Sequence, residues 1–437
     1  MNNFYSWNRR DFLAKVMGSL AASPLLSSRN FFFAQSTKTA PAAPNAGGNA
    51  KPIYRTLGKT GITLPIVSMG VMNADVPGLI PRSYQLGIRH FDTAAGYQQG
   101  RNEEMVGRMI KEMGVRDKVI ISTKVARLGR GRGQAPEQTY SVAEMKAHFN
   151  EVFDGSLKRL QMDYVDILYN HSADSEADVN AEGTLEAMRA LKKEGKARFL
   201  GVSSHQPEMA LKEAMKLGVY DVVLVPINFT MASNEGLLRT IDEAAKQGIG
   251  LVAMKTQAGG ATRPDPKLGK PLGPASMTAL LKWVLHHDSI TTAIPGYTTY
   301  EQLEQNFSVA SNLAYSQEEQ EFLSGKSVVA NAQFCVQCGK CRADCPAGVD
   351  IPQLMRAHMY AVQYSNLPLA AETMAAIACG KGLTACADCE SCRALCRNSV
   401  NIARKIEHLK ALSGHGVFRT QLLLESAARL TGRDASG

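Results

Sequence analysis

The chain has 437 residues, of which 45% are hydrophobic and 20% are charged. This length exceeds that of one ordinary domain and predicts a large domain followed by a small one, and the hydrophobic content is typical of a globular protein with a sizeable core. The formal net charge is +9, but no basic stripe with interleaved aromatic residues occurs, which argues against nucleic acid as a partner.

The N-terminus is predicted to be an export leader over residues 1–35. Arg9 and Arg10, followed by Phe12 and Leu13, precede a mildly apolar stretch. This order resembles a twin-arginine signal. An ordinary basic leader or a chance arginine pair in a surface helix is the alternative. Because the twin-arginine pathway exports folded proteins, the leader predicts a periplasmic location.

The rest of the chain divides into three predicted parts. Residues 36–52 are rich in Ala, Pro, Asn and Gly, which predicts a flexible linker. Residues 53–325 are expected to form the large domain and residues 326–437 the small one. No segment after the leader has the roughly 18 consecutive apolar residues that a transmembrane helix requires, so none is expected in the mature chain.

Apolar segments alternate with amphipathic helical patterns throughout the large domain. Several segments are almost continuously apolar, as are strands of a parallel sheet that is buried on both faces. This alternation predicts an α/β fold, a closed (β/α)8 TIM barrel with an outer ring of helices. A doubly wound open sheet is the alternative, but the glycine-rich turn that usually follows its first strand is missing. The eight predicted strands are residues 64–70, 88–94, 119–125, 165–171, 199–204, 222–228, 250–256 and 291–296.

Polar residues end several of these strands, where the chemistry of such barrels lies. Asp92 ends the second predicted strand, and Tyr97 lies in the loop beyond it. Lys124 ends the third strand and His171 the fourth. Each residue alone could be structural, as a strand-end cap, a salt-bridge partner, a half-buried aromatic or a satisfied histidine. Together they are the candidate catalytic residues.

Two cysteine motifs dominate the small domain. Each has the spacing C-x2-C-x2-C-x3-C, which is typical of four-iron clusters, and the fourth cysteine of one motif usually binds the cluster of the other. The sequence therefore predicts two 4Fe-4S clusters with exchanged ligands. A zinc site or disulfides are the alternatives, but zinc usually takes two separated cysteine pairs, and cysteines this close would pair only with strain. The predicted ligand sets are Cys335, Cys338, Cys341 and Cys396, and Cys386, Cys389, Cys392 and Cys345.

Helices are predicted around these motifs. Residues 351–378 are expected to form one or two amphipathic helices with a break at 366–368, and two more are expected at 401–412 and 417–430. Cys379 belongs to neither motif and is expected to be a buried, inert thiol.

The sequence also resembles a known family. The segments GIRHFDTAAGY, STKV and YVDILYNH, which contain the four candidate catalytic residues, are similar to the aldo/keto reductase superfamily. The resemblance covers the whole predicted barrel. Together with the cysteine motifs, it extends to the iron–sulfur, ferredoxin-fused branch of that superfamily. It implies an oxidoreductase that uses a nicotinamide cofactor and acts on a small carbonyl or alcohol substrate.

The chemistry of the four residues agrees with this resemblance. A free tyrosine has a pKa near 10, and the Lys124 ammonium is expected to lower the pKa of Tyr97 by favouring the phenolate. Asp92 would keep Lys124 charged and oriented. Tyr97 would then donate a proton to a carbonyl oxygen while a hydride from the nicotinamide reaches the carbon, and His171 would hydrogen-bond to the same oxygen.

The resemblance also implies a dinucleotide site. Paired serines stand where the family binds the carboxamide, a later pair matches its adenine side, and residues after the seventh strand could contact the pyrophosphate, although a glycine pair there is also an ordinary turn. The positions near the 2′-phosphate depart from the family pattern, so the cofactor is expected to be NADP(H) or NAD(H). The candidate contacts are Ser203, Ser204, Lys255, Thr256, Gly259, Gln305 and Asn306.

Two functions are consistent with the sequence. The first is an exported oxidoreductase that interconverts a carbonyl and an alcohol, in which the clusters transfer electrons or support the small domain. The second is an electron-transfer protein that keeps the barrel as a scaffold and passes electrons to a redox partner protein. The complete Asp92, Tyr97, Lys124 and His171 set favours the first.

Overall fold

The structure is a computed structural model of the chain. The predicted leader, nearly all of the predicted linker, Cys379 and the predicted helix at 417–430 lie outside the described residues. The described residues belong to one compact unit. They are 51–129, 140–259, 273–324, 334–378, 380–386, 389 and 391–414.

Eight parallel strands form a single sheet in the order β10-β9-β8-β7-β6-β5-β4-β3. Its two edges meet through bridges between Val67 and Ala293 and between Gly70 and Gly296. The predicted barrel is therefore confirmed, and the open sheet is excluded. The strands are β3 (Met69–Gly70), β4 (His90–Asp92), β5 (Ile120–Ala126), β6 (Val165–His171), β7 (Ala197–Ser203), β8 (Val222–Pro226), β9 (Gly250–Met254) and β10 (Thr292–Ala293).

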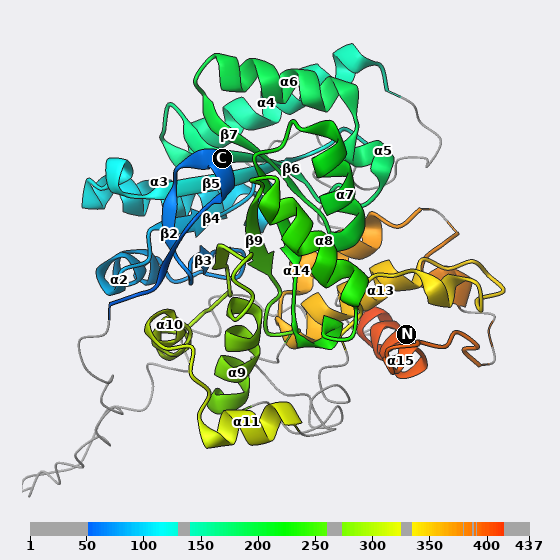
Figure 1. Cartoon of the computed structure of the whole chain (residues 1–437). Coiled ribbons are helices and arrows are strands. Elements are labelled where there is room, and N and C mark those ends of the chain that lie inside the picture. Colours follow the sequence, from blue (N-terminus) through cyan, green and yellow to red (C-terminus); the bar gives the residue numbers. More distant parts are fainter. Residues whose placement is uncertain are drawn as a thin grey trace, which may run out of the picture. The chain divides into compact units, whose positions relative to one another are not determined.

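Helices surround the strands (Figure 1). They form because their apolar residues recur on one face, which packs against the sheet, and several begin at a side-chain cap. In α4, for example, Ser141 and Glu144 make a capping box. The helices of this part are α2 (Leu79–Leu86), α3 (Arg101–Met113), α4 (Val142–Leu160), α5 (Glu176–Val179), α6 (Glu182–Lys193), α7 (Pro207–Leu217), α8 (Glu235–Lys246), α9 (Pro274–Leu285), α10 (Tyr300–Ser308) and α11 (Gln317–Ser324).

A hairpin that the sequence did not predict precedes the barrel. Its strands β1 (Tyr54–Thr56) and β2 (Thr63–Pro65) are antiparallel. Apolar hairpin residues such as Leu57 pack against side chains inside the barrel. At Gly58, where φ is +51°, a Cβ atom would lie 2.3 Å from the Gly248 carbonyl oxygen, so only glycine fits. Because Gly248 precedes β9, the hairpin covers the amino ends of the strands and leaves their carboxyl ends for the site.

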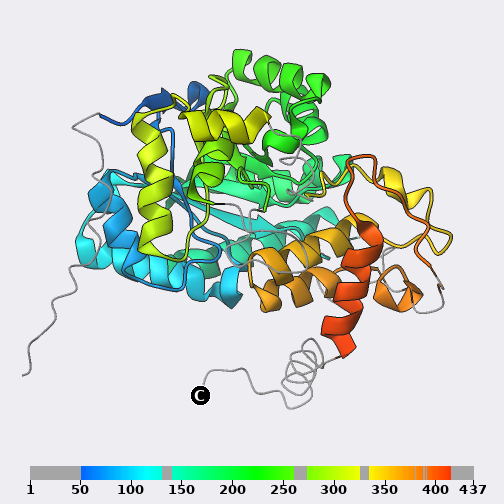
Figure 2. The same cartoon turned by 90° about the horizontal axis from the view of Figure 1, so that it is seen from below.

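The C-terminal region is helical, as predicted. It contains α13 (Ile351–His358), a π-helical segment η7 (Met359–Gln363), α14 (Leu367–Ala375) and α15 (Ile402–Gly414). The predicted break lies between η7 and α14, where the Asn366 side chain caps α14 by accepting a hydrogen bond from the Leu369 N–H (3.1 Å). Helix α15 packs against α13 (Figure 2). No helix among the described residues is long and apolar enough to cross a membrane.

Several hydrogen bonds connect this region to the loops that follow barrel strands. Gln206, after β7, donates to the Gln337 carbonyl oxygen (2.7 Å), and Asn366 donates to the Asn73 side chain after β3 (2.9 Å). Lys255, after β9, donates to the Tyr360 hydroxyl (3.3 Å). The C-terminal helices therefore cover the carboxyl ends of the strands, which is the end where the candidate catalytic residues lie.

Candidate active site

The four candidate catalytic residues converge at the carboxyl ends of β4, β5 and β6. Lys124 Nζ donates hydrogen bonds to an Asp92 carboxylate oxygen, to the Thr93 carbonyl oxygen (2.6 Å) and to the Tyr97 hydroxyl (3.4 Å). The Tyr97 ring meets the His171 ring edge to face, with 5.9 Å between ring centres. The phenol, the ammonium and the imidazole thus surround one point at which a carbonyl oxygen could bind.

Asp92 is held by a neighbour that the sequence reasoning missed. The Ser122 hydroxyl donates to the second Asp92 oxygen (2.6 Å) and also contacts His90 Nε2 (2.9 Å). Ser122 lies two residues before Lys124 on β5, so both side chains point to the same face of the strand. The two-residue spacing of Ser122 and Lys124 could have indicated from the sequence that both side chains face Asp92. All of these carboxylate contacts are buried, which fixes the orientation of Asp92 and through it of Lys124.

The expectation that the pKa of Tyr97 is lowered is wrong. The pKa of Tyr97 is raised well above its ordinary value, first because the phenol is buried, then because the Asp92 carboxylate and the Tyr360 and Tyr364 phenols disfavour a second negative charge. The charge of Lys124 is already matched by Asp92. Tyr97 is therefore a protonated acid at neutral pH, which suits donation of a proton to a carbonyl oxygen.

These residues open into a cavity of about 600 Å³. This cavity, which we call the catalytic chamber, has the size of a small-molecule pocket. One wall is the barrel mouth, with Tyr97, Lys124 and His171, and another comes from α4. The sequence reasoning missed the third wall, because nothing in a local pattern says which distant helix closes a barrel. That wall is formed by Gln353, Arg356, Tyr360, Leu369, Glu372, Thr373 and Ala376 of the C-terminal helices.

A buried ionic network fastens the third wall to the barrel. Arg356 on α13 donates to the Asp174 carboxylate after β6 (3.0 Å) and to His205 Nδ1 after β7 (2.6 Å). Burial first, and then the Arg356 charge, lower the pKa of His205 to about 3. His205 is thus a neutral acceptor at Nδ1, and the Arg356 charge is balanced by Asp174.

Replacing Arg356 is expected to loosen this wall. In the Arg356→Ala variant, the Asp174 carboxylate loses its buried cation, which should lower the free energy of unfolding of the C-terminal region by about 3 kcal/mol. Hydrogen exchange of the α13 and α14 amides, together with denaturant unfolding, measures this change. The control is Arg82→Ala, which breaks the half-exposed Arg82–Glu304 pair and should cost less than about 1 kcal/mol. Equal effects of the two variants would contradict the role of Arg356.

The predicted cofactor contacts separate into two groups. Ser203 and Lys255 line the catalytic chamber, and the Ser203 hydroxyl oxygen accepts the Ser172 N–H (2.9 Å). Ser204 is buried and donates to Asp174 (3.3 Å). The structure therefore brings only part of this set to the catalytic residues.

The remaining predicted contacts lie against protein. Thr256 is buried, and its hydroxyl has no hydrogen-bond partner among the described residues. Asn306 accepts a hydrogen bond from Gln257 (2.7 Å), and the neighbouring Gln305 on α10 is half-buried. A Cβ atom on Gly259 would lie 2.6 Å from the Gln363 side chain of η7, so the C-terminal region packs directly on this turn.

The first predicted set of cysteines lines one small cavity. Cys335, Cys338, Cys341 and Cys396 surround it, although Cys396 is 55 or more residues away from the others in sequence. Burial raises the pKa of the Cys335 thiol to about 12; a backbone hydrogen bond at Gln337 opposes this effect, and Cys396, Cys341 and Cys338 contribute to it. Four thiols held this close favour a positive metal centre that would neutralise their thiolates.

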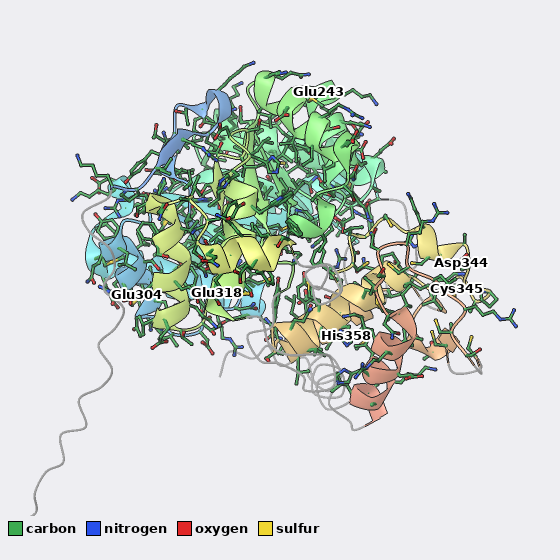
Figure 3. All side chains as sticks on the ribbon, turned by 60° about the horizontal axis from the view of Figure 1, so that its bottom comes forward. Glu243, Glu304, Glu318, Asp344, Cys345 and His358 are labelled. Carbon is green, nitrogen blue, oxygen red and sulfur yellow. The ribbon has the colours of Figure 1, made fainter. Side chains whose placement is uncertain are left out.

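The second set also comes together. Burial raises the pKa of the Cys386 thiol; Lys410 opposes this effect, and Cys345, Cys389 and Cys392 add to it. Figure 3 shows Cys345 beside Asp344 in the loops of the C-terminal region. The fourth cysteine of each run thus lies with the other run, the arrangement that an exchange of ligands requires.

The cysteine geometry bears on the alternatives to a cluster. All eight described cysteines are unpaired, so no disulfide joins them. Within the described residues, no group of three His, Cys, Asp or Glu side chains is placed to hold a single metal ion. A four-iron cube binds one cysteine at each iron corner, so it spaces the sulfurs further apart than one zinc ion does.

Comparisons with known proteins agree with this geometry. Residues 71–277 match the Aldo/keto reductase family. This match spans most of the barrel. The chain is 28% identical over 321 residues to the L-glyceraldehyde 3-phosphate reductase of Escherichia coli strain K12, a match that covers 61% of this chain and 90% of the relative. It is 27% identical over 303 residues to the L-galactose dehydrogenase of Arabidopsis thaliana, covering 62% of this chain and 92% of the relative.

A solved structure shows the same likeness. The holo form of the aldo-keto reductase AKR11C1 from Bacillus halodurans superposes with a TM-score of 0.51 at 26% identity, covering 62% of this chain and 95% of that chain. The predicted resemblance is confirmed at the level of the family, and the protein is an oxidoreductase of the aldo/keto reductase type.

Proposed function

We propose that this aldo/keto reductase reduces a small carbonyl compound to an alcohol by hydride transfer from a nicotinamide cofactor. The observation that supports it is the convergence of Tyr97, Lys124 and His171 in one chamber, with Tyr97 held protonated. A protonated phenol is the form needed in the reductive direction, because the carbonyl oxygen gains a proton as its carbon gains a hydride.

The side chains divide the work of this reaction. The substrate oxygen binds between the Tyr97 hydroxyl and the His171 imidazole, which together orient the carbonyl. As the C–O π bond breaks and the new C–H bond forms, negative charge grows on the oxygen, and Tyr97 transfers its phenolic proton to it. Lys124 Nζ, 3.4 Å from the phenol oxygen, then stabilises the phenolate until solvent restores the proton.

A nicotinamide cofactor fits part of the site. Ser203 is a polar group in the chamber wall beside the catalytic residues, and it would hold the nicotinamide end, which supplies the hydride. Residues of the adenine side, such as Asn306, are occupied by internal hydrogen bonds. NADP(H) and NAD(H) both remain candidates.

The C-terminal cysteines fit two 4Fe-4S clusters, and we include both in the proposal. The first is assigned to Cys335, Cys338, Cys341 and Cys396, which line one cavity, and the second to the set around Cys386. The proposal also includes export of the folded protein to the periplasm, based on the Arg9–Arg10 leader, because a cluster protein must acquire its metal before it leaves the cytoplasm.

One observation favours the second candidate function, an iron–sulfur electron-transfer protein that uses the barrel as a scaffold. Met359 and Gln363 of η7 pack on Gly259 in the turn expected to hold the cofactor pyrophosphate. If this packing is permanent, a dinucleotide cannot lie there.

The two functions are separated by the nucleotide content of the anaerobically purified protein. For the reductase, we expect about one nicotinamide nucleotide per chain on denaturation, or quenching of NADPH or NADH fluorescence on titration, and oxidation of that nucleotide by an aldehyde. The Arg356→Ala variant should lose a retained nucleotide faster on dialysis, because its third wall is loosened. A protein with no bound nucleotide, no quenching and no aldehyde turnover contradicts the reductase and leaves electron transfer.

A further inference from the structure

We propose that Lys255, supported by Tyr360 of the C-terminal region, is the anchor for a carboxylate or phosphate group on the carbonyl substrate. This inference rests on the proposed reductase function and names the class of its substrate, an anionic aldehyde or ketone. The sequence alone had suggested that Lys255 contacts the cofactor pyrophosphate, and the geometry of the chamber points elsewhere.

Lys255 differs from the other cationic side chains of the catalytic chamber in its ion pairing. Lys124, Arg127, Arg159 and Arg356 also line the chamber, and each forms an ion pair with a carboxylate. Lys255 forms no ion pair with any carboxylate of the described residues. Its ammonium donates to the Tyr360 hydroxyl (3.3 Å) and lies 5.1 Å from the centre of the Tyr360 ring.

The positive charge of Lys255 affects the pKa of the catalytic Lys124. The chamber has two carboxylates of its own, Glu151 and Glu372, and no ion pair joins either of them to Lys255 in the described part of the chain. Burial lowers the pKa of Lys124, Asp92 opposes that effect, and the Lys255 charge lowers the pKa further. Lys255 is therefore close enough to Lys124 to affect its pKa. An anion bound between the two ammonium groups would offset their mutual repulsion.

The backbone on both sides of the contact is unusual. Lys255 has φ of +53°, in the left-handed region that side-chain-bearing residues rarely adopt. The Ala258 N–H (3.0 Å) and the Asn228 side chain (3.3 Å) both donate to its carbonyl oxygen and hold this turn. Tyr360 lies in the π-helical segment η7. Strained residues and π-helical turns concentrate at binding sites. In the chamber wall the strained Lys255 contacts Tyr360 of the π-helical segment.

The position of Lys255 also distinguishes substrate from cofactor. Lys255 lines the chamber that contains Tyr97 and His171, and its ammonium donates to Tyr360 in the chamber wall. Thr256 and Gly259, which follow it in the same turn, lie against protein. An anion held by Lys255 thus shares a cavity with the reacting carbonyl. A chamber of about 600 Å³ accommodates an aldehyde with a separate anionic group.

The test compares matched aldehydes. We expect the wild type to reduce 4-carboxybenzaldehyde with a higher kcat/KM than benzaldehyde, and 4-oxobutanoate with a higher kcat/KM than butanal. Lys255→Met should reduce these preference ratios by roughly 10- to 100-fold, the value of a charge-assisted hydrogen bond. Tyr360→Phe, which keeps the ring but removes the hydroxyl, should reduce the preference ratios less, by raising the KM of the anionic aldehydes. The control is Lys246→Met, at an exposed lysine of α8 that should leave the ratios unchanged.

Two further measurements decide whether Lys255 binds the substrate or the cofactor. If Lys255→Met weakens binding of NADPH or NADH and leaves the preference ratios unchanged, Lys255 serves the cofactor phosphates and the proposal is overturned. If the wild type reduces no aldehyde, the proposed function fails, and calorimetry with 4-(hydroxymethyl)benzoate still tests the anion site. Weaker binding to Lys255→Met than to the wild type supports the anchor, and equal binding overturns it.

Discussion

The Tyr97→Phe variant is expected to lose carbonyl turnover by about 10²- to 10⁴-fold, the usual contribution of a positioned acid. The substitution removes the phenolic hydroxyl that lies 3.4 Å from Lys124 Nζ, and it leaves the ring in place against His171. Steady-state assays of aldehyde reduction, run on wild type and variant with the same iron content, measure the loss.

Two controls make the result specific to the site. Tyr54→Phe removes a phenol from the β1–β2 hairpin at the opposite end of the barrel and should leave kcat unchanged. The iron content and visible spectrum of Tyr97→Phe should equal those of the wild type, because no described cysteine lines the chamber that contains Tyr97. If turnover survives in Tyr97→Phe, another group supplies the proton and the catalytic assignment is wrong.

The second large effect is expected in paired cysteine variants. With exchanged ligands, Cys341→Ala combined with Cys396→Ala damages one cluster twice and should leave about four of about eight iron atoms per chain. Cys341→Ala combined with Cys345→Ala damages both clusters and should leave almost no iron. Iron assays and the low-temperature electron paramagnetic resonance spectrum of the reduced protein measure these contents.

The same pairs test whether the ligands are exchanged at all. If each run bound its own cluster, Cys341 and Cys345 would belong together, and the two double variants would give the opposite iron contents. Full iron in both variants would contradict clusters at these cysteines. The structure supports the exchange because Cys396 lines the cavity of Cys335, Cys338 and Cys341.

Much of the barrel could be predicted from the sequence because the information is local. Each buried strand is an apolar run of a few residues, and each helix has its own 3.6-residue pattern. The order of catalytic residues at successive strand ends followed directly, since parallel strands present their carboxyl ends at one face. The β1–β2 hairpin was missed because its strands are three residues long and its apolar contacts are inside the barrel.

The pKa of Tyr97 was predicted in the wrong direction for a physical reason. A spacing pattern indicates that Lys124 can approach the phenol, but it does not indicate how deeply the phenol is buried or which other groups surround it. Burial and the Asp92 carboxylate both disfavour the phenolate, and Tyr360 and Tyr364 add to this from a segment more than 250 residues away in the chain.

The sequence by itself determined the barrel, the candidate catalytic residues and the composition of the two cysteine sets, because these depend on residue type and spacing along short stretches. Only the tertiary structure decided that the C-terminal helices close the catalytic chamber, that Arg356 binds Asp174 and His205, and that Lys255 faces the chamber beside Tyr360. These contacts join residues more than 100 positions apart, and they depend on how two packed surfaces fit, which no local pattern specifies.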